Sequence, residues 1–83
     1  MNSIAIVDYG CGNLFNLQKA LHALRVPKYA VVTKGRDILS YDKIILPGVG
    51  AFQTGMTHLV EREFDVHLRE HAARCKPILG ICL

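Results

Sequence analysis

The stretch SIAIVDYGCGNL, residues 3–14, decides the fold class because its pattern changes from that of a strand to that of a helix. Residues 3–8 form a short apolar run rich in β-branched side chains, which predicts a buried β-strand. The glycines of YGCGN predict a turn directly after it. Leucines then recur at steps of three and four residues, at Leu14, Leu17, Leu21 and Leu24. This spacing predicts a helix that has Asn13 as its N-cap and ends before Pro27.

The alternation of strand and helix patterns continues along the sequence. Three further apolar runs predict strands, at residues 29–33, 43–48 and 77–82. Apolar residues at helical spacing predict one or two helices across residues 53–75, whereas the polar stretch 34–42 predicts a loop. This order predicts βαβ units and an α/β fold, with a parallel, doubly wound, flavodoxin-like sheet in three layers and strand order 2-1-3-4.

Composition and charge exclude several classes of protein. Apolar residue types make up 51% of the sequence and charged types 20%, which is typical of a packed domain. The net charge of +3 is spread without a basic run, so we expect no nucleic-acid partner. We expect no signal peptide and no membrane segment, and therefore a cytoplasmic protein. Three cysteines are an odd number, which favours reduced thiols over a disulfide framework.

Three glycine-containing loops follow predicted strands. They are YGCGN at residues 9–13, PGVGAF at residues 47–52 and GICL at residues 80–83. In a parallel sheet all three open at the carboxyl edge, where α/β proteins bind their ligands. We therefore expect a functional site at this edge.

Cys82 is the candidate nucleophile at the predicted edge. A strand that ends in Gly-x-Cys and leads into a helix forms a tight turn that lifts the cysteine above the sheet. A thiol at a helix N-terminus has its thiolate form favoured by the backbone N–H groups. The alternative interpretation is that Cys82 is one more buried side chain of a core strand.

The loop PGVGAF is a candidate oxyanion site. Its glycines can adopt conformations closed to other residues, so the N–H groups of Gly48, Val49 and Gly50 could point together into the cleft. By itself the motif is more typical of an ordinary strand-to-helix turn. Its occurrence together with Gly-x-Cys favours the functional interpretation.

The motifs DYGCGNL, LPGVGAF and LGICL, in this order and spacing, resemble the N-terminal part of class I glutamine amidotransferases. The middle motif resembles the branch that contains the glutaminase subunits of imidazole glycerol phosphate synthase in histidine biosynthesis. The resemblance covers the whole sequence. It implies that residues 1–83 are the N-terminal part of one amidotransferase domain, and that this part ends just after the nucleophile.

The resemblance also implies a mechanism and a partner. Cys82 would attack the side-chain amide of glutamine, form a thioester and release ammonia, with no cofactor and no metal. The oxyanion would be held by the N–H of Leu83 and by an N–H of the PGVG loop, at Val49 or Gly50. Ammonia would pass to a (β/α)8 cyclase subunit. Asn13 and Asn16 resemble positions at the interface with that cyclase.

The sequence departs from the family pattern in one respect. The family takes its histidine base and its orienting glutamate from a downstream His-x-Glu segment, which residues 1–83 do not contain. The four histidines present fall in predicted helices, away from the carboxyl edge, so none is expected to serve Cys82. We therefore expect residues 1–83 alone to lack glutaminase activity.

A possible metal site lies on the last predicted helix. His67, His71 and Cys75 are spaced by four residues and share one helix face. Three ligands that span two turns lie too far apart to close around one zinc ion, so packing against the sheet is the favoured interpretation. We assign no role to Cys11.

Two other functions remain open from the sequence. One is a related class I amidotransferase that feeds ammonia to another acceptor, for instance in surface-sugar synthesis. The other is a flavodoxin-like module that binds a phosphate group at YGCGN, although this loop lacks the third glycine and the acidic residue of the dinucleotide motif. In either case PILGICL is predicted to form an apolar sheet edge, so we expect residues 1–83 alone to self-associate.

Overall fold

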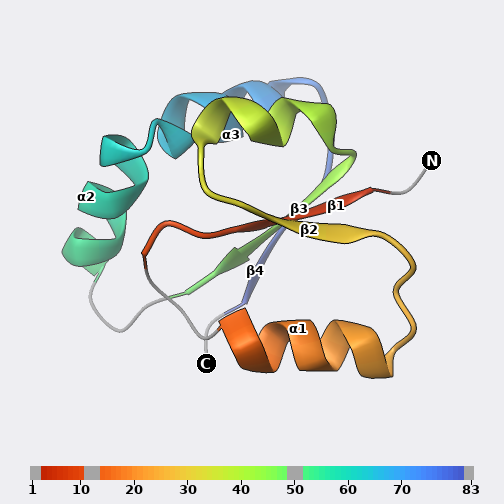
Figure 1. Ribbon diagram of the computed structural model, residues 1–83. Coiled ribbons are helices and arrows are strands. Elements are labelled where there is room, and N and C mark those ends of the chain that lie inside the picture. Colours follow the sequence, from red (N-terminus) through yellow and green to blue (C-terminus); the bar gives the residue numbers. More distant parts are fainter. Residues whose placement is uncertain (1–2, 11–13, 49–51, 82–83) are drawn as a thin grey trace.

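The computed structural model describes residues 3–10, 14–48 and 52–81, and these form one parallel sheet covered on both faces (Figure 1). The sheet has four strands in the order β2-β1-β3-β4, and every neighbouring pair is parallel. The strands are β1 (Ile4–Val7), β2 (Tyr29–Val32), β3 (Lys43–Pro47) and β4 (Ile78–Ile81). The predicted α/β class, the doubly wound architecture and the strand order are confirmed.

Helices lie on both faces of the sheet. Helix α1 (Leu14–Ala23) covers one face. The other face carries α2 (Phe52–Glu61), α3 (Phe64–Ala73) and the 3-10 helix η1 (Gly35–Ser40). Within the described ranges, no helix has the length and apolar character needed to cross a membrane.

The two faces of β1 contribute to two separate clusters of buried side chains. Ala5 and Val7 point into the larger cluster, beneath η1 and α3, where Phe64 is fully buried. Ile6 points into the smaller cluster, which it shares with Leu21 of α1. Successive side chains of a strand point to opposite faces, so a strand that is buried on both sides needs an uninterrupted apolar run. This requirement explains the IAIV sequence of β1.

The prediction of a loop at residues 34–42 is wrong for most of that stretch. Residues Gly35–Ser40 form η1, and Ile38 within it is fully buried beneath α3. A short 3-10 helix has too few residues to show a clear periodicity of apolar side chains. Its mostly polar sequence therefore resembles that of a loop.

Helix α1 ends earlier than the leucine spacing predicted. The N–H of Val26 donates to the carbonyl of Leu21 at 3.0 Å, and Arg25 has a φ of 58°. This hydrogen bond and the positive φ are the features of the Schellman motif, which ends many helices. Arg25 occupies the position that glycine usually takes. Leu24 therefore lies outside α1 and is 75% exposed, so its predicted place on the buried face is wrong.

Helix α3 ends in the same motif, and this gives a stability prediction. Cys75 has a φ of 59°, and the N–H of Lys76 donates to the carbonyl of His71. A side chain at positive φ costs about 1 kcal/mol relative to glycine. We expect Cys75→Gly to raise the free energy of unfolding by about 0.5–1 kcal/mol, measured by urea titration. Ala72→Gly, inside α3, is the control and should lower it by a similar amount.

Asp42 joins the amino ends of β1 and β3, opposite the edge predicted to be functional. The N–H of Ser3 donates to its carboxylate at 3.2 Å, and this bond holds the pKa of Asp42 below its ordinary value. A carboxyl whose pKa is lowered by folding stabilises the fold above its unfolded pKa, and this contribution is lost as the pH falls. The contact therefore supports the sheet at neutral pH.

Candidate active site

The carboxyl ends of β3 and β4 bring two of the predicted site motifs together. Pro47 pairs with Ile81 in the parallel register, and the N–H of Gly48 donates to the carbonyl of Ile81. Gly48 opens the glycine-rich loop, and Ile81 directly precedes Cys82. The sheet therefore fixes the start of the predicted oxyanion loop beside the start of the predicted nucleophile turn.

The same contact bears on the oxyanion prediction for Gly48. An N–H that donates to a sheet carbonyl is already paired. In this structure the Gly48 amide extends the ladder between β3 and β4, so it does not face an oxyanion. Five other predicted site residues lie outside the described ranges: Asn13, Val49, Gly50, Cys82 and Leu83. Asn16 lies in α1 and is exposed.

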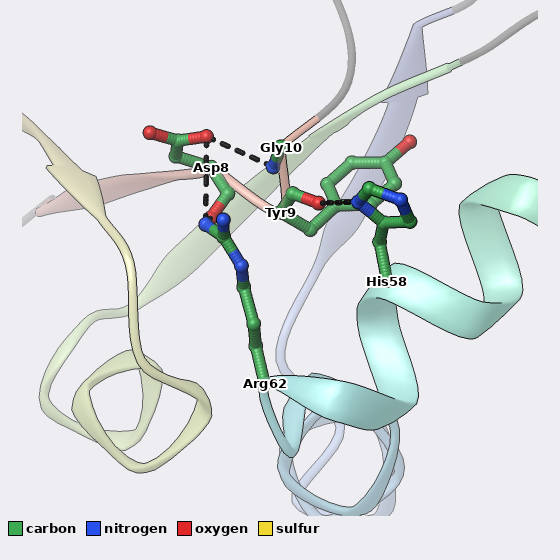
Figure 2. A network of polar contacts seen from close by, with 5 residues as sticks. All are labelled: Asp8, Tyr9, Gly10, His58 and Arg62. Carbon is green, nitrogen blue, oxygen red and sulfur yellow. Dashed lines mark hydrogen bonds and ion pairs between the residues drawn. The ribbon is translucent and has the colours of Figure 1, made fainter.

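The end of β1 reaches the same edge and is held there by polar contacts from α2 (Figure 2). Nδ1 of His58 lies 3.0 Å from the carbonyl oxygen of Tyr9. Nη1 of Arg62, directly after α2, donates to the carbonyl of Asp8 at 2.9 Å and lies 3.9 Å from its carboxylate. On the other side, the Tyr9 hydroxyl donates to the carbonyl of Pro47. These contacts join β1, β3 and α2 at one edge.

Position 10 at this edge requires a glycine. Its φ is 83°, and its N–H donates to the Asp8 carboxylate at 3.1 Å. A Cβ atom at this position would lie 2.8 Å from Nδ1 of His58. The turn after β1 therefore needs a residue that tolerates positive φ and leaves room for the His58 ring.

The position of His58 corrects one prediction. All four histidines fall in helices as expected, but His58 contacts the carboxyl-edge turn after β1 and is not remote from it. Its ring nitrogen is committed to the Tyr9 carbonyl, so the contact is structural. The four-residue spacing of His58 and Arg62 is compatible with contacts on one side of α2 and its end, but this spacing is too common to predict them.

The predicted packing role of the last helix holds for His71. This side chain is 1% exposed, and its Nε2 lies 3.2 Å from the carbonyl oxygen of Pro77. Nδ1 of His67 lies 2.8 Å from the carbonyl oxygen of Glu63, four residues earlier. Cys75 lies beyond α3 and is exposed, so its predicted place on the buried helix face is wrong. Within residues 3–10, 14–48 and 52–81, no group of His, Cys, Asp or Glu side chains could hold a metal ion.

The polar contacts at the edge disfavour the phosphate-site hypothesis. A phosphate at YGCGN would need the free amides of the turn. The Gly10 amide instead donates to the Asp8 carboxylate, whose negative charge would also oppose a phosphate. The Gly10 amide is therefore not free to bind a phosphate.

Comparison with known proteins finds similar sequences. A scan against family models finds no model that matches the chain. Among curated proteins, the chain is 45% identical to the imidazole glycerol phosphate synthase subunit HisH of Methylococcus capsulatus, over 100% of the chain and 38% of that protein. It is 48% identical to the HisH subunit of Oceanobacillus iheyensis, over 96% of the chain and 39% of that protein. The HisH subunit of Symbiobacterium thermophilum is 46% identical, over 100% of the chain and 39% of its own length.

These relatives confirm the resemblance that the three motifs indicated. The similarity extends over 96–100% of the chain in proteins from three different species. The chain spans about two fifths of the length of the curated relatives it matches. The chain is thus similar, over 96–100% of its length, to the imidazole glycerol phosphate synthase subunit HisH.

Proposed function

We propose that this chain is the N-terminal part of an amidotransferase domain that hydrolyses glutamine, with Cys82 as the nucleophile. The observation that carries the proposal is the pairing of Gly48 with Ile81, which sets the glycine-rich loop beside the residue that precedes Cys82. The names of the relatives support the same pathway, since each is a subunit of imidazole glycerol phosphate synthase.

The proposed reaction has two steps. The Cys82 thiolate attacks the side-chain amide carbon of glutamine and forms a tetrahedral intermediate with a negative oxygen. The carbon–nitrogen bond then breaks, the nitrogen takes a proton from the general acid, and ammonia leaves a glutamyl thioester. Water adds to the thioester carbon, the carbon–sulfur bond breaks, and glutamate and the thiol are released. The histidine that moves these protons belongs to the proposed downstream His-x-Glu segment.

Backbone N–H groups would stabilise the negative oxygen. The N–H of Leu83 follows the nucleophile, and Val49 and Gly50 belong to the loop that begins beside Ile81. The Gly48 amide is engaged by the sheet, so the loop contribution falls to Val49 or Gly50. Such donors act without reorganising during the reaction because the backbone holds them in place.

The proposed partner is a (β/α)8 cyclase subunit, in a cytoplasmic heterodimer with glutaminase and lyase activities. Each relative is named as a subunit of a synthase, which supports a partner that consumes the ammonia. Asn13 directly precedes α1 in the sequence and Asn16 lies in the first turn of α1, and we assign both to the interface with this partner. Supply of ammonia to another acceptor has no support in the names of these relatives.

A chimaera tests the proposal directly. Residues 1–83 replace the matching segment of the Methylococcus capsulatus subunit, which is 45% identical and supplies the remaining domain. With a cyclase present, we expect the chimaera to release ammonia from glutamine. The 83-residue chain alone should give no rate above background, because it contains no His-x-Glu segment. Ammonia is measured by a coupled assay.

The isolated chain needs a check of its own association state. Strand β4 lies at the edge of the sheet, and its Leu79 side chain is 57% exposed. We expect this apolar edge to pair with a second copy, which sedimentation would detect. Ammonia release by the isolated chain that is lost in Cys82→Ser would contradict the expected need for a His-x-Glu segment. A folded chimaera without any glutaminase activity would contradict the proposed function.

A further inference from the structure

Tyr9 contacts residues on both sides of the glycine-rich loop. Its hydroxyl donates to the carbonyl of Pro47, the residue directly before Gly48. Its own carbonyl oxygen lies 3.0 Å from Nδ1 of His58 on α2, the helix that follows the loop. Its ring shares a buried cluster with Leu59 of the same helix. One residue just after β1 therefore contacts both the strand that leads into the loop and the helix that follows it.

Asp8 supplies a second attachment for α2. Its carbonyl accepts a hydrogen bond from Arg62, which lies one helical turn after His58 (Figure 2). The N–H of Asp8 donates to the carbonyl of Val32 at 2.9 Å, so this attachment is fixed to the sheet. The ion pair between Arg62 and Asp8 adds little, because both side chains are partly exposed to solvent. The backbone carbonyls of Asp8 and Tyr9 are therefore the groups that hold α2.

We propose that Tyr9 is a positioning residue for the oxyanion-binding loop, acting through Pro47 and His58, an inference that rests on the proposed function. Glycines restrict a backbone little, so the orientation of a Gly-Val-Gly loop depends strongly on how its two ends are held. Oxyanion stabilisation is sensitive to small displacements of its donors, since it depends on their fixed orientation. Tyr9 supplies that restraint at both ends, through its hydroxyl to Pro47 and its backbone carbonyl to His58, and its side chain is 3% exposed.

The test removes one hydroxyl group in the chimaera. Tyr9→Phe keeps the buried ring but deletes the hydrogen bond to Pro47. We expect kcat for glutamine hydrolysis to fall about threefold to tenfold, the effect of one hydrogen bond, while KM for glutamine stays unchanged. A change confined to kcat indicates an interaction that matters in the transition state.

Alkylation separates positioning from general loss of structure. Iodoacetamide reacts with a thiolate without passing through a tetrahedral oxyanion, so its rate at Cys82 should be the same in Tyr9→Phe as in the parent chimaera. Mass spectrometry resolves each cysteine, and the exposed Cys75 serves as an internal reference. A parallel loss of alkylation at Cys82 and of glutamine turnover would mean that Tyr9 only supports the fold, and would overturn the proposal.

The other end of the restraint is tested at His58. His58→Ala removes the donor to the Tyr9 carbonyl and should also lower kcat, whereas His58→Gln keeps an N–H donor and should restore most of it. His67→Ala is the matched control, since this histidine makes a similar contact to the carbonyl of Glu63.

The outcomes distinguish the two proposals. If Tyr9→Phe and His58→Ala turn over glutamine as fast as an active parent, the positioning role is wrong and the proposed function stands. If the folded parent itself shows no turnover, the proposed function fails.

Discussion

The Gly35→Ala variant of the chimaera is expected to lose much of its stability. A Cβ atom on Gly35 would lie 2.2 Å from the carbonyl oxygen of Glu63 and 2.8 Å from the backbone nitrogen of Phe64. These are backbone atoms at the turn between α2 and α3, so they cannot rotate away as a side chain would. Glu63 has a φ of 61°, which leaves this turn little freedom to adjust. We expect a loss of at least about 2–3 kcal/mol.

A loss of that size would be a large part of the free energy of unfolding, which is about 5–15 kcal/mol for small domains. The Gly35→Ala substitution would also separate η1 from α3, because the Gly35 N–H donates to the carbonyl of Arg62 at 3.0 Å. The matched control is Gly80→Ala in β4, where an added Cβ would meet no atom of the described residues within 4 Å. Urea unfolding of the two variants gives the comparison. Equal midpoints would show that the contact at Gly35 relaxes without cost.

The sheet was predictable from the sequence because its strands are buried on both faces. Such strands must be continuous apolar runs, and the glycines that follow β1 and β3 mark where these runs end. Parallel strand order then follows from the intervening helices. The four strands were therefore found with errors of one or two residues at their ends.

The details around the helices were not predictable in the same way. Helix η1 has one fully buried side chain, Ile38, in an otherwise polar stretch, so no period marks it. Both Schellman motifs place a non-glycine residue at positive φ, Arg25 and Cys75, and this removes the usual signal for a helix end. The missing signals explain why Leu24 and Cys75 were assigned to buried helix faces.

The candidate site was predictable where it depends on topology. Parallel strands end at a common edge, so the glycine-rich loop and the Gly-x-Cys motif had to meet there, as the pairing of Gly48 with Ile81 now shows. The contacts of His58 and Arg62 with β1 depend on how α2 docks against the sheet. A spacing of four residues occurs too often to identify such contacts by itself.

Replacing Cys82 by serine is the second change with a large expected effect. A serine hydroxyl is far less acidic than a thiol and remains protonated at neutral pH, so it is not an activated nucleophile at this position. We expect kcat for glutamine hydrolysis by the chimaera to fall about a thousandfold or more. Cys75→Ser changes an exposed thiol at the end of α3 and is expected to leave the rate unchanged.

The central claim is that Cys82 forms a covalent bond to glutamine at the edge where β3 and β4 end. The most direct measurement is labelling of the chimaera with an electrophilic glutamine analogue, followed by peptide mass spectrometry. The account predicts one adduct per chain, located on Cys82 and suppressed by excess glutamine. Equal labelling of Cys75, or labelling of Cys82 that glutamine does not suppress, would contradict it.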